Sequence, residues 1–208
     1  MSSTAHSLAI GPVRCAWFPY QRGTPAEPQA RQWLAQALAV PEPSLQLRRD
    51  VHGRPHLVTS RSDHDVNWSH SGERLLVALA QGARVGADIE WLRPRPNAMT
   101  LARRFFTPAE AASLAALPHD QAERWFVRLW CAKEAVLKAH GRGIAFGLER
   151  LEFSRDGEGW RLSACDPALG APQDWRLHAF APAPDYLATL AWRPMDCAPA
   201  RGAPTMAG

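Results

Sequence analysis

The chain has 208 residues, of which 46% are hydrophobic and 21% are charged. This composition is typical of a globular protein that buries about 70% of its unfolded surface, and it excludes a mainly disordered chain. No apolar run reaches the ~18 residues of a membrane helix, and the first ten residues lack the charged start and apolar core of a secretory signal. We therefore expect a cytoplasmic protein of one large domain or two small ones, with no membrane partner.

The charge balance and the cysteines indicate which kinds of partner and of cysteine chemistry to expect. The 24 basic side chains against 20 acidic ones give a net charge of +4, which suits a nucleic acid, a phosphorylated cofactor or an acidic protein. The cysteines lie far apart and include no C-x-x-C pair, so we interpret them as reduced thiols. They are Cys15, Cys131, Cys165 and Cys197.

The first half of the chain predicts one helix followed by antiparallel strands. After an irregular, proline-rich start, apolar residues at helical spacing predict a helix over 28–40. The last two of the strand-like runs flank Gln81 and Gly82, which predict a hairpin turn. These runs cover 45–48, 65–69, 74–80 and 84–91.

The second half follows a linker marked by Pro94 and Pro96. Two short helices are predicted over 97–105 and 108–116, the second beginning with a capping box from Thr107 to Glu110. The longest periodic segment, 121–140, predicts a helix that ends at Gly141. Strand-like runs that complete a meander then cover 148–154, 159–164, 175–180 and 186–192.

Each half therefore has a helix and antiparallel strands. This pattern predicts an α+β protein, a pseudo-dimer of two similar halves in which each helix packs on an antiparallel sheet. We expect the halves to span 1–93 and 94–193. The segment 194–208 is rich in proline, alanine and glycine, and it predicts a disordered tail.

Two acidic residues in the run 84–91 are candidates for a metal site. Residues two apart in a strand point to the same face, so Asp88 and Glu90 should project side by side while Ile89 faces the core. Adjacent carboxylates repel one another unless a cation lies between them, and magnesium prefers such oxygen ligands. The alternative is a half-exposed strand with two solvated acids.

The long helix carries a second candidate group. Trp130, Glu134 and Lys138 lie four residues apart and share one helix face. The chain has 22 arginines but only two lysines, Lys133 and Lys138, which suggests that these positions need a compact ammonium. A partly buried glutamate and lysine beside a tryptophan stabilise a fold poorly, because desolvation offsets their attraction, so they favour an active site. The alternative is a surface pair worth ~0.3 to 0.5 kcal/mol.

The third candidate group is Asn67 to Ser71, with Gly53 to Pro55 before it. Ser69 and His70 are neighbours in a strand and should point apart, so they are poorly placed as a nucleophile and its base. His70 and Arg54 fit better as phosphate ligands, whereas a structural role for the histidine is the alternative.

In chain order these motifs resemble those of the surfactin-type (Sfp-type) 4'-phosphopantetheinyl transferases. The resemblance covers roughly residues 53–153, and the ordered set is specific although each piece is weak. Arg54 replaces the lysine often found there, which keeps the charge but changes the donor geometry. The matching stretches are Gly53-Arg54-Pro55, Asn67 to Ser71, Gly86 to Glu90, Arg104 to Glu110, and Leu129 to Lys138.

The resemblance implies an enzyme that moves the 4'-phosphopantetheine group of coenzyme A onto a serine of an apo acyl or peptidyl carrier protein and releases 3',5'-ADP. It implies that Asp88, Glu90 and Glu134 bind Mg²⁺, or Mn²⁺ in its place. Glu134 would also take the proton of the serine, and Lys138 would neutralise the pyrophosphate. The implied catalytic residues are thus Asp88, Glu134 and Lys138. Whether the carrier serves fatty acid, polyketide or nonribosomal peptide synthesis stays open.

The resemblance also implies the coenzyme A contacts. Ser69 and His70 would contact its phosphates, the Gly53-Arg54-Pro55 stretch would line the adenine side, and Arg31 would bind the 3'-phosphate. The complete implied set is Arg31, Gly53, Arg54, Pro55, Ser69, His70 and Lys138.

The arginines of the linker and short helices could steer an acidic carrier protein, or they could simply solvate the surface. They are Arg93, Arg95, Arg103 and Arg104. Two other function classes stay open: a metal-dependent phosphohydrolase or nuclease, and a non-catalytic basic binding module. We expect a monomer and no nucleic-acid partner. The tryptophans lie mostly in core patterns, which argues against a surface on which bases stack.

Overall fold

A computed structural model gives the fold, and it describes residues 6–58, 63–157 and 159–195. The α-helices within these ranges are α1 (Glu27–Leu38), α2 (Ala98–Phe105), α3 (Pro108–Ala115) and α4 (His119–His140). The strands are β1 (His6–Ile10), β2 (Val13–Pro19), β3 (Gln46–Arg49), β4 (Pro55–Val58), β5 (His64–Ser71), β6 (Arg74–Gln81), β7 (Ala83–Trp91), β8 (Leu151–Asp156), β9 (Gly159–Cys165), β10 (Arg176–Phe180) and β11 (Tyr186–Pro194). Short 3-10 helices are η1 (Glu42–Ser44), η2 (Gly143–Phe146), η3 (Leu148–Arg150), η4 (Pro167–Leu169) and η5 (Pro172–Asp174).

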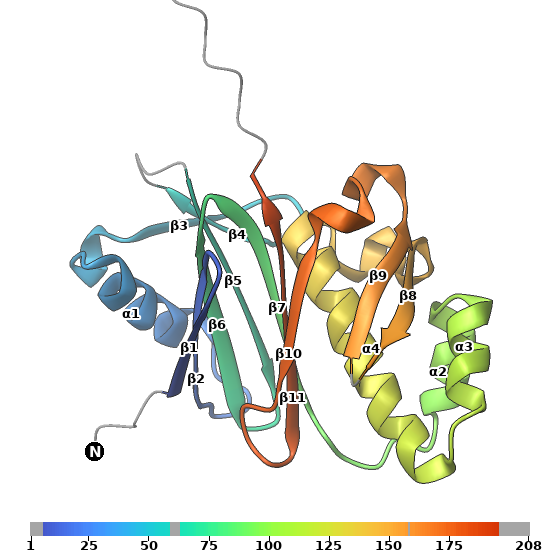
Figure 1. The fold of residues 1–208 in the computed structure, drawn as a ribbon. Coiled ribbons are helices and arrows are strands. Elements are labelled where there is room, and N and C mark those ends of the chain that lie inside the picture. The colour runs from blue at the N-terminus through green and yellow to red at the C-terminus, as the bar shows by residue number, and fades with distance from the viewer. Residues whose placement is uncertain (1–5, 59–62, 158, 196–208) are drawn as a thin grey trace, which may run out of the picture.

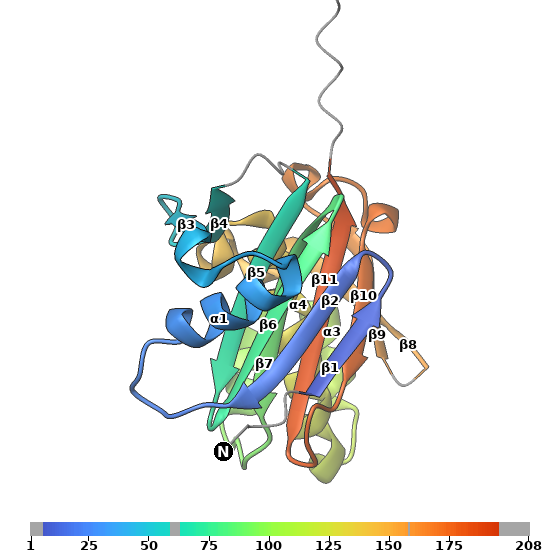
Figure 2. The same ribbon diagram turned by 90° about the vertical axis from the view of Figure 1, so that its left-hand side faces the viewer.

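Two antiparallel sheets pack face to face, and a helix covers the outer face of each (Figure 1). The strand orders are β1-β2-β6-β5 in the first sheet and β10-β11-β7 in the second. Helix α1 lies on the outer face of the first sheet, which Figure 2 turns toward the viewer, and α4 lies on that of the second. The pairs β3-β4 and β8-β9 form separate two-stranded sheets. Helices and antiparallel sheets are thus combined as the sequence predicted.

The continuous apolar run of β6 reflects this layering. Alternate residues starting at Leu75 pack against α1, and those starting at Leu76 pack against the second sheet. A strand covered on both faces needs no polar side, so its sequence does not alternate. In β7, by contrast, Val85, Ala87 and Ile89 face the first sheet, while the residues between them face α4.

The predicted hairpin at Gln81 and Gly82 is wrong. Strand β6 pairs with β2 and β5, whereas β7 pairs with β11 along its whole length. The chain crosses from one sheet to the other at Gly82, whose φ of +69° suits glycine. The boundary expected between residues 93 and 94 therefore does not separate the two sheets, because β7 joins strands from the end of the chain.

The single meander predicted near the C-terminus is also wrong, since β8 and β9 pair apart from β10 and β11. Strands β1 and β2 were missed because Pro12 and Pro19, at the borders of β2, indicate a loop in the sequence. The predicted helices are confirmed, as is the capping box of α3, in which the Glu110 amide lies 3.3 Å from Thr107 Oγ1. Almost all of the predicted tail, and Cys197, lie outside the described residues. No helix among the described residues is long and apolar enough to cross a membrane.

Candidate active site

Strands β5 and β7 belong to different sheets, yet side chains of β5 reach the backbone of β7. Asp65 Oδ2 accepts a hydrogen bond from the Val85 amide at 2.8 Å, and Asn67 Oδ1 accepts one from the Ala87 amide at 3.0 Å. Both polar side chains are buried. Because residues two apart on β5 meet residues two apart on β7, these bonds fix how the first sheet lies along the second.

Further along the two strands, side chains of β5 also bind the two acidic side chains of β7 that were predicted as metal ligands. Ser69 Oγ donates to Asp88 Oδ1 at 3.0 Å, and Ser71 Oγ donates to Glu90 Oε2 at 3.2 Å. The serines of the N-x-S-H-S motif and the acids of the G-x-D-x-E motif are therefore in register. The predicted orientation of the strand is confirmed, since Asp88 is 4% exposed on the α4 side and Ile89 is 1% exposed in the core between the sheets.

Gly86 lets α4 pass directly over β7. A Cβ at this position would lie 1.9 Å from the Ala135 carbonyl oxygen and 2.5 Å from the Ala139 amide nitrogen. Only a residue without a side chain permits this approach of helix backbone to strand. The contact brings Glu134 and Lys138, on the same part of α4, beside the strand that carries Asp88.

Lys138 links the helix to both strands. Its Nζ lies 2.6 Å from Asp88 Oδ1 and donates to Ser69 Oγ at 2.8 Å. Burial alone would lower the pKa of Lys138, but the charges of Asp88 and Glu134 outweigh it and raise the pKa. The Lys138 ammonium is therefore charged at neutral pH and lies against the Asp88 carboxylate.

Glu134 has the most perturbed carboxylate of the site. Its residue is 5% exposed, and its pKa is raised to about 7, first by burial and then by the charge of Asp88. Lys138 opposes this rise and Glu90 adds to it. A carboxylate with this pKa exchanges its proton near neutral pH, as a general base must.

Glu90 lies at the outer end of the group. Its carboxylate forms an ion pair with Arg95 at 2.6 Å, and both side chains are about one-fifth exposed. Burial and the charge of Asp88 raise the pKa of Glu90, while Arg95 and Ser71 oppose the rise. Asp88, Glu90 and Glu134 thus interact electrostatically, although they come from two separate elements.

The three carboxylates fit a divalent cation in donor chemistry and in charge. Asp88 Oδ2 is buried and accepts no hydrogen bond from the described residues, and the mutual repulsion of the acids favours a bound cation. They are not a ready-made site, however: no three histidine, cysteine, aspartate or glutamate side chains in the described ranges are arranged to hold a metal ion. The metal therefore stays a prediction.

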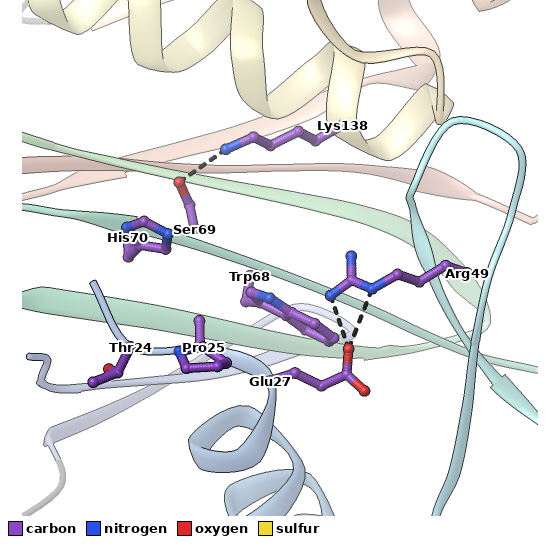
Figure 3. A pocket seen from close by; sticks show the side chains of 9 residues that line it. Thr24, Pro25, Glu27, Arg49, Trp68, Ser69, His70 and Lys138 are labelled. Carbon is purple, nitrogen blue, oxygen red and sulfur yellow. Dashed lines mark hydrogen bonds and ion pairs between the residues drawn. The ribbon is translucent and has the colours of Figure 1, made fainter. Parts of the chain in front are cut away.

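A pocket of about 510 Å³ opens beside Lys138 and extends toward the start of α1 (Figure 3). On its far side Arg49 forms an ion pair with Glu27 at 2.9 Å and lies over the Trp68 ring, 5.2 Å from its centroid. The lining combines cations, an aromatic ring and a hydroxyl, which suits a ligand with both phosphates and a ring system. The lining residues are Thr24, Pro25, Ala26, Glu27, Arg49, Trp68, Ser69, His70 and Lys138.

Of the predicted coenzyme A contacts, Ser69, His70 and Lys138 line this pocket. Ser69 and His70 point apart as predicted, because the serine is buried against Asp88 while the histidine is exposed. The His70 ring stacks on Tyr20 at 4.5 Å, and its pKa is lowered by burial and by Lys138. Both residues nevertheless reach the pocket because it lies at the edge of β5.

The other predicted contacts lie elsewhere. Arg54 is 7% exposed, forms a buried ion pair with Asp65 and donates to the Val85 carbonyl at 3.1 Å. Gly53 lies in the turn between β3 and β4, and Pro55 is the first residue of β4. Arg31 donates to the Leu45 carbonyl. None of these residues lines the pocket that the described residues form, so their roles stay predictions.

Arg49 and Trp68 were missed from the sequence. Nothing in the sequence distinguishes Arg49 from the many other arginines. Trp68 lies inside the N-x-S-H-S motif, but the alternation of β5 places it opposite Ser69, toward the α1 side. Only the packing of β3 near the start of α1 brings the two side chains to one pocket.

Comparisons with known proteins identify the family. Residues 84–191, which include both acidic motifs, match the 4'-phosphopantetheinyl transferase superfamily. The transferase HetI of Nostoc sp. is 31% identical over 93% of this chain and 83% of its own length. AcpT of Escherichia coli is 32% identical over 56% of this chain, and Sfp of Bacillus subtilis is 26% identical over 62%.

The matches differ in extent. This chain spans 61% of the length of AcpT and 56% of that of Sfp, but 83% of HetI. All three relatives are named as 4'-phosphopantetheinyl transferases. The match to HetI extends over nearly the whole chain, and the family match extends from β7 into β11. This chain belongs to the 4'-phosphopantetheinyl transferase superfamily.

Proposed function

We propose that this protein transfers the 4'-phosphopantetheine group of coenzyme A to a serine of an apo acyl or peptidyl carrier protein, with Mg²⁺, and releases 3',5'-ADP. Membership in the superfamily gives the reaction class. The observation that carries the proposal is the position of Lys138, which pairs with Asp88 of β7 and lines a pocket with cationic and aromatic walls. Glu134, one turn earlier on α4, is buried and feels the charges of both acids of β7. The sequence motifs favour the surfactin-type branch.

Coenzyme A would enter the pocket between α1 and α4. Lys138 lies at the inner wall, where its ammonium can meet the pyrophosphate, and His70 lies next to it. Arg49 lies at the opposite wall and is the best-placed cation for a further phosphate, with Trp68 available to the adenine. Glu27 would then release Arg49 to the incoming anion.

Asp88, Glu90 and Glu134 would hold Mg²⁺ or Mn²⁺, which when bound neutralises charge on the pyrophosphate. The bond that forms joins the serine Oγ to the phosphorus that bears the pantetheine arm. The bond that breaks joins this phosphorus to the oxygen of the departing 3',5'-ADP. Glu134 takes the proton from the serine, directly or through water. Lys138 stabilises the charge on the leaving diphosphate.

The carrier protein would approach the linker and the helices α2 and α3. Arg93 lies over the Trp91 ring at 5.9 Å, and Trp91 is 36% exposed at the end of β7. Arg103 and Arg104 are exposed on α2, whereas Arg95 is engaged by Glu90. An acidic carrier surface would be attracted to the exposed arginines. The pseudo-dimer description, a cytoplasmic location and a monomeric state remain predictions from the sequence.

The test is mass spectrometry of a purified apo-carrier protein incubated with this protein, coenzyme A and Mg²⁺. We expect one phosphopantetheine per acceptor serine, and none on a carrier whose acceptor serine is replaced by alanine. Chelation of the metal should stop the reaction. Release of nucleotide from coenzyme A in the absence of any carrier would instead indicate a phosphohydrolase and contradict the proposal.

A further inference from the structure

Asp88 is held through one of its two oxygens. Ser69 Oγ donates to Oδ1 at 3.0 Å, and Lys138 Nζ donates to the same oxygen at 2.6 Å. The second oxygen, Oδ2, is buried and has no partner among the described residues. A buried carboxylate oxygen without a partner is costly, so its orientation points to a ligand that is bound during function.

Glu90, two residues further along β7, is held in the same way. Ser71 Oγ donates to Oε2 at 3.2 Å, and Arg95 Nη2 donates to the same oxygen at 2.6 Å. Each acid is thus held by a serine of β5 and by a cation from another element. In both acids the serine and the cation bind the same carboxylate oxygen.

We infer that Ser71 is a positioning residue for Glu90 and that Arg95 is a built-in counter-ion, which a divalent cation at the acids must overcome. The inference rests on the proposed function, because it assumes that Glu90 is a metal ligand. It assigns roles to two residues outside the motif positions predicted to bind the metal or coenzyme A.

The Ser71 hydroxyl is fixed from two sides. Its oxygen accepts a hydrogen bond from the Trp91 amide at 3.1 Å, so its proton is directed to Glu90 Oε2. The hydroxyl carries no net charge, so it orients Glu90 and favours its ionised form without competing with a cation for the site. Loss of such an outer partner typically weakens metal binding ~10-fold or more, because the ligand must be ordered when the metal binds.

Arg95 acts in the opposite direction. It lies in the linker between Pro94 and Pro96, and its carbonyl accepts a hydrogen bond from the Ala98 amide at 2.8 Å, where α2 begins. Its guanidinium is close enough to Glu90 to repel a second cation there, and the half-buried position reduces solvent screening. Removal of Arg95 should therefore strengthen metal binding, by at least ~3-fold, the scale of one partly exposed ion pair.

The experiment measures Mn²⁺ binding to the full chain by electron paramagnetic resonance of the free ion, with and without coenzyme A. We expect Ser71→Ala to raise the Kd for Mn²⁺ about tenfold and Ser71→Thr, which retains the hydroxyl, to restore it. Arg95→Met should lower the Kd at least ~3-fold. The Kd for Mn²⁺ should thus change in opposite directions in the two variants. General damage to the fold would instead weaken Mn²⁺ binding in both. An unchanged Kd in Ser71→Ala, or an unchanged or raised Kd in Arg95→Met, overturns the corresponding role.

Matched controls are available away from the acids. Ser163→Ala removes an exposed serine whose hydroxyl donates to the Glu152 carbonyl at 3.0 Å, and Arg150→Met removes an exposed ion pair with Asp166 at 2.8 Å. Neither should change the Kd. Carrier modification is measured in parallel: if transfer proceeds but the variants fail to show the expected pattern, the inference falls and the proposed function stands. If the carrier is not modified, the proposed function fails whatever the Mn²⁺ titration shows.

Discussion

Glu134→Gln should make the protein more stable at high pH while removing its activity. The Glu134 carboxyl has a pKa of about 7 in the folded chain against an ordinary 4.5, because burial and Asp88 disfavour its charge. The folded state therefore binds more protons than the unfolded state between these two values. The contribution of this carboxyl to the free energy of unfolding falls as pH rises through this window, and it is fully present only below pH 4.5. Glutamine resembles the protonated acid and does not suffer this loss.

The size of the effect follows from the two pKa values. Ionising this carboxyl lowers the free energy of unfolding by about 3 kcal/mol at pH 8 but by only about 1 kcal/mol at pH 5. The variant should exceed the unsubstituted protein by these amounts when a chelator removes divalent cations. Excess Mg²⁺ should narrow the gap at pH 8, because a cation binds the protein that has all three ionised acids more tightly than the variant that has two.

Urea denaturation followed by tryptophan fluorescence at pH 5 and pH 8 measures both values. Transfer to the carrier, measured on the same samples, should fall at least ~100-fold, the usual effect of losing a general base. Glu123→Gln, the same substitution on an earlier turn of α4, is the control and should leave transfer unchanged. Equal stability differences at the two pH values would refute the electrostatic account, and undiminished transfer would refute the catalytic role.

Two further variants test how the site is supported. Gly86→Ala should lower the free energy of unfolding by about 3 kcal/mol and abolish transfer, because its Cβ would lie 1.9 Å from the Ala135 carbonyl oxygen; Gly159→Ala, with its closest contact at 3.7 Å, is the control in the urea titration. Lys133→Met should lower it by about 3 to 5 kcal/mol, because Glu110, 2.7 Å away and 1% exposed, would be left as an unpaired buried charge. Retained stability in either variant contradicts the contact on which the prediction depends.

The sequence predicted features that depend on local geometry. The alternation of Asp88, Ile89 and Glu90 follows from the two-residue period of a strand, and the capping box at Thr107 follows from the first turn of a helix. Neither prediction requires knowledge of what packs nearby. The same local reasoning placed Glu134 and Lys138 on one face of α4.

Features that depend on distant pairing were not predictable. Gln81 and Gly82 have the sequence of a hairpin, but β7 instead pairs with β11, about a hundred residues further along. Arg54 suits a phosphate by charge, yet it meets Asp65 across neighbouring strands and is buried with it. The two lysines show the same limit. Lys138 reaches the acids of β7, whereas Lys133 is 0% exposed and pairs with Glu110 at 2.7 Å.

The site forms where β5 of the first sheet meets β7 of the second beside α4, which explains why so many short motifs had to coincide. Ser69 and His70 come from the first sheet, Asp88 from the second, and Lys138 from the helix that covers it. Their relative position depends on polar side chains of β5 that bind the backbone and acids of β7, and on a glycine that admits α4. The polar side chains of β5 therefore affect both the fold and the catalytic site. A change in the register of β5 by one residue would turn every serine away from its carboxylate. The spacing of two residues in both motifs is therefore the property that joins the fold to the chemistry.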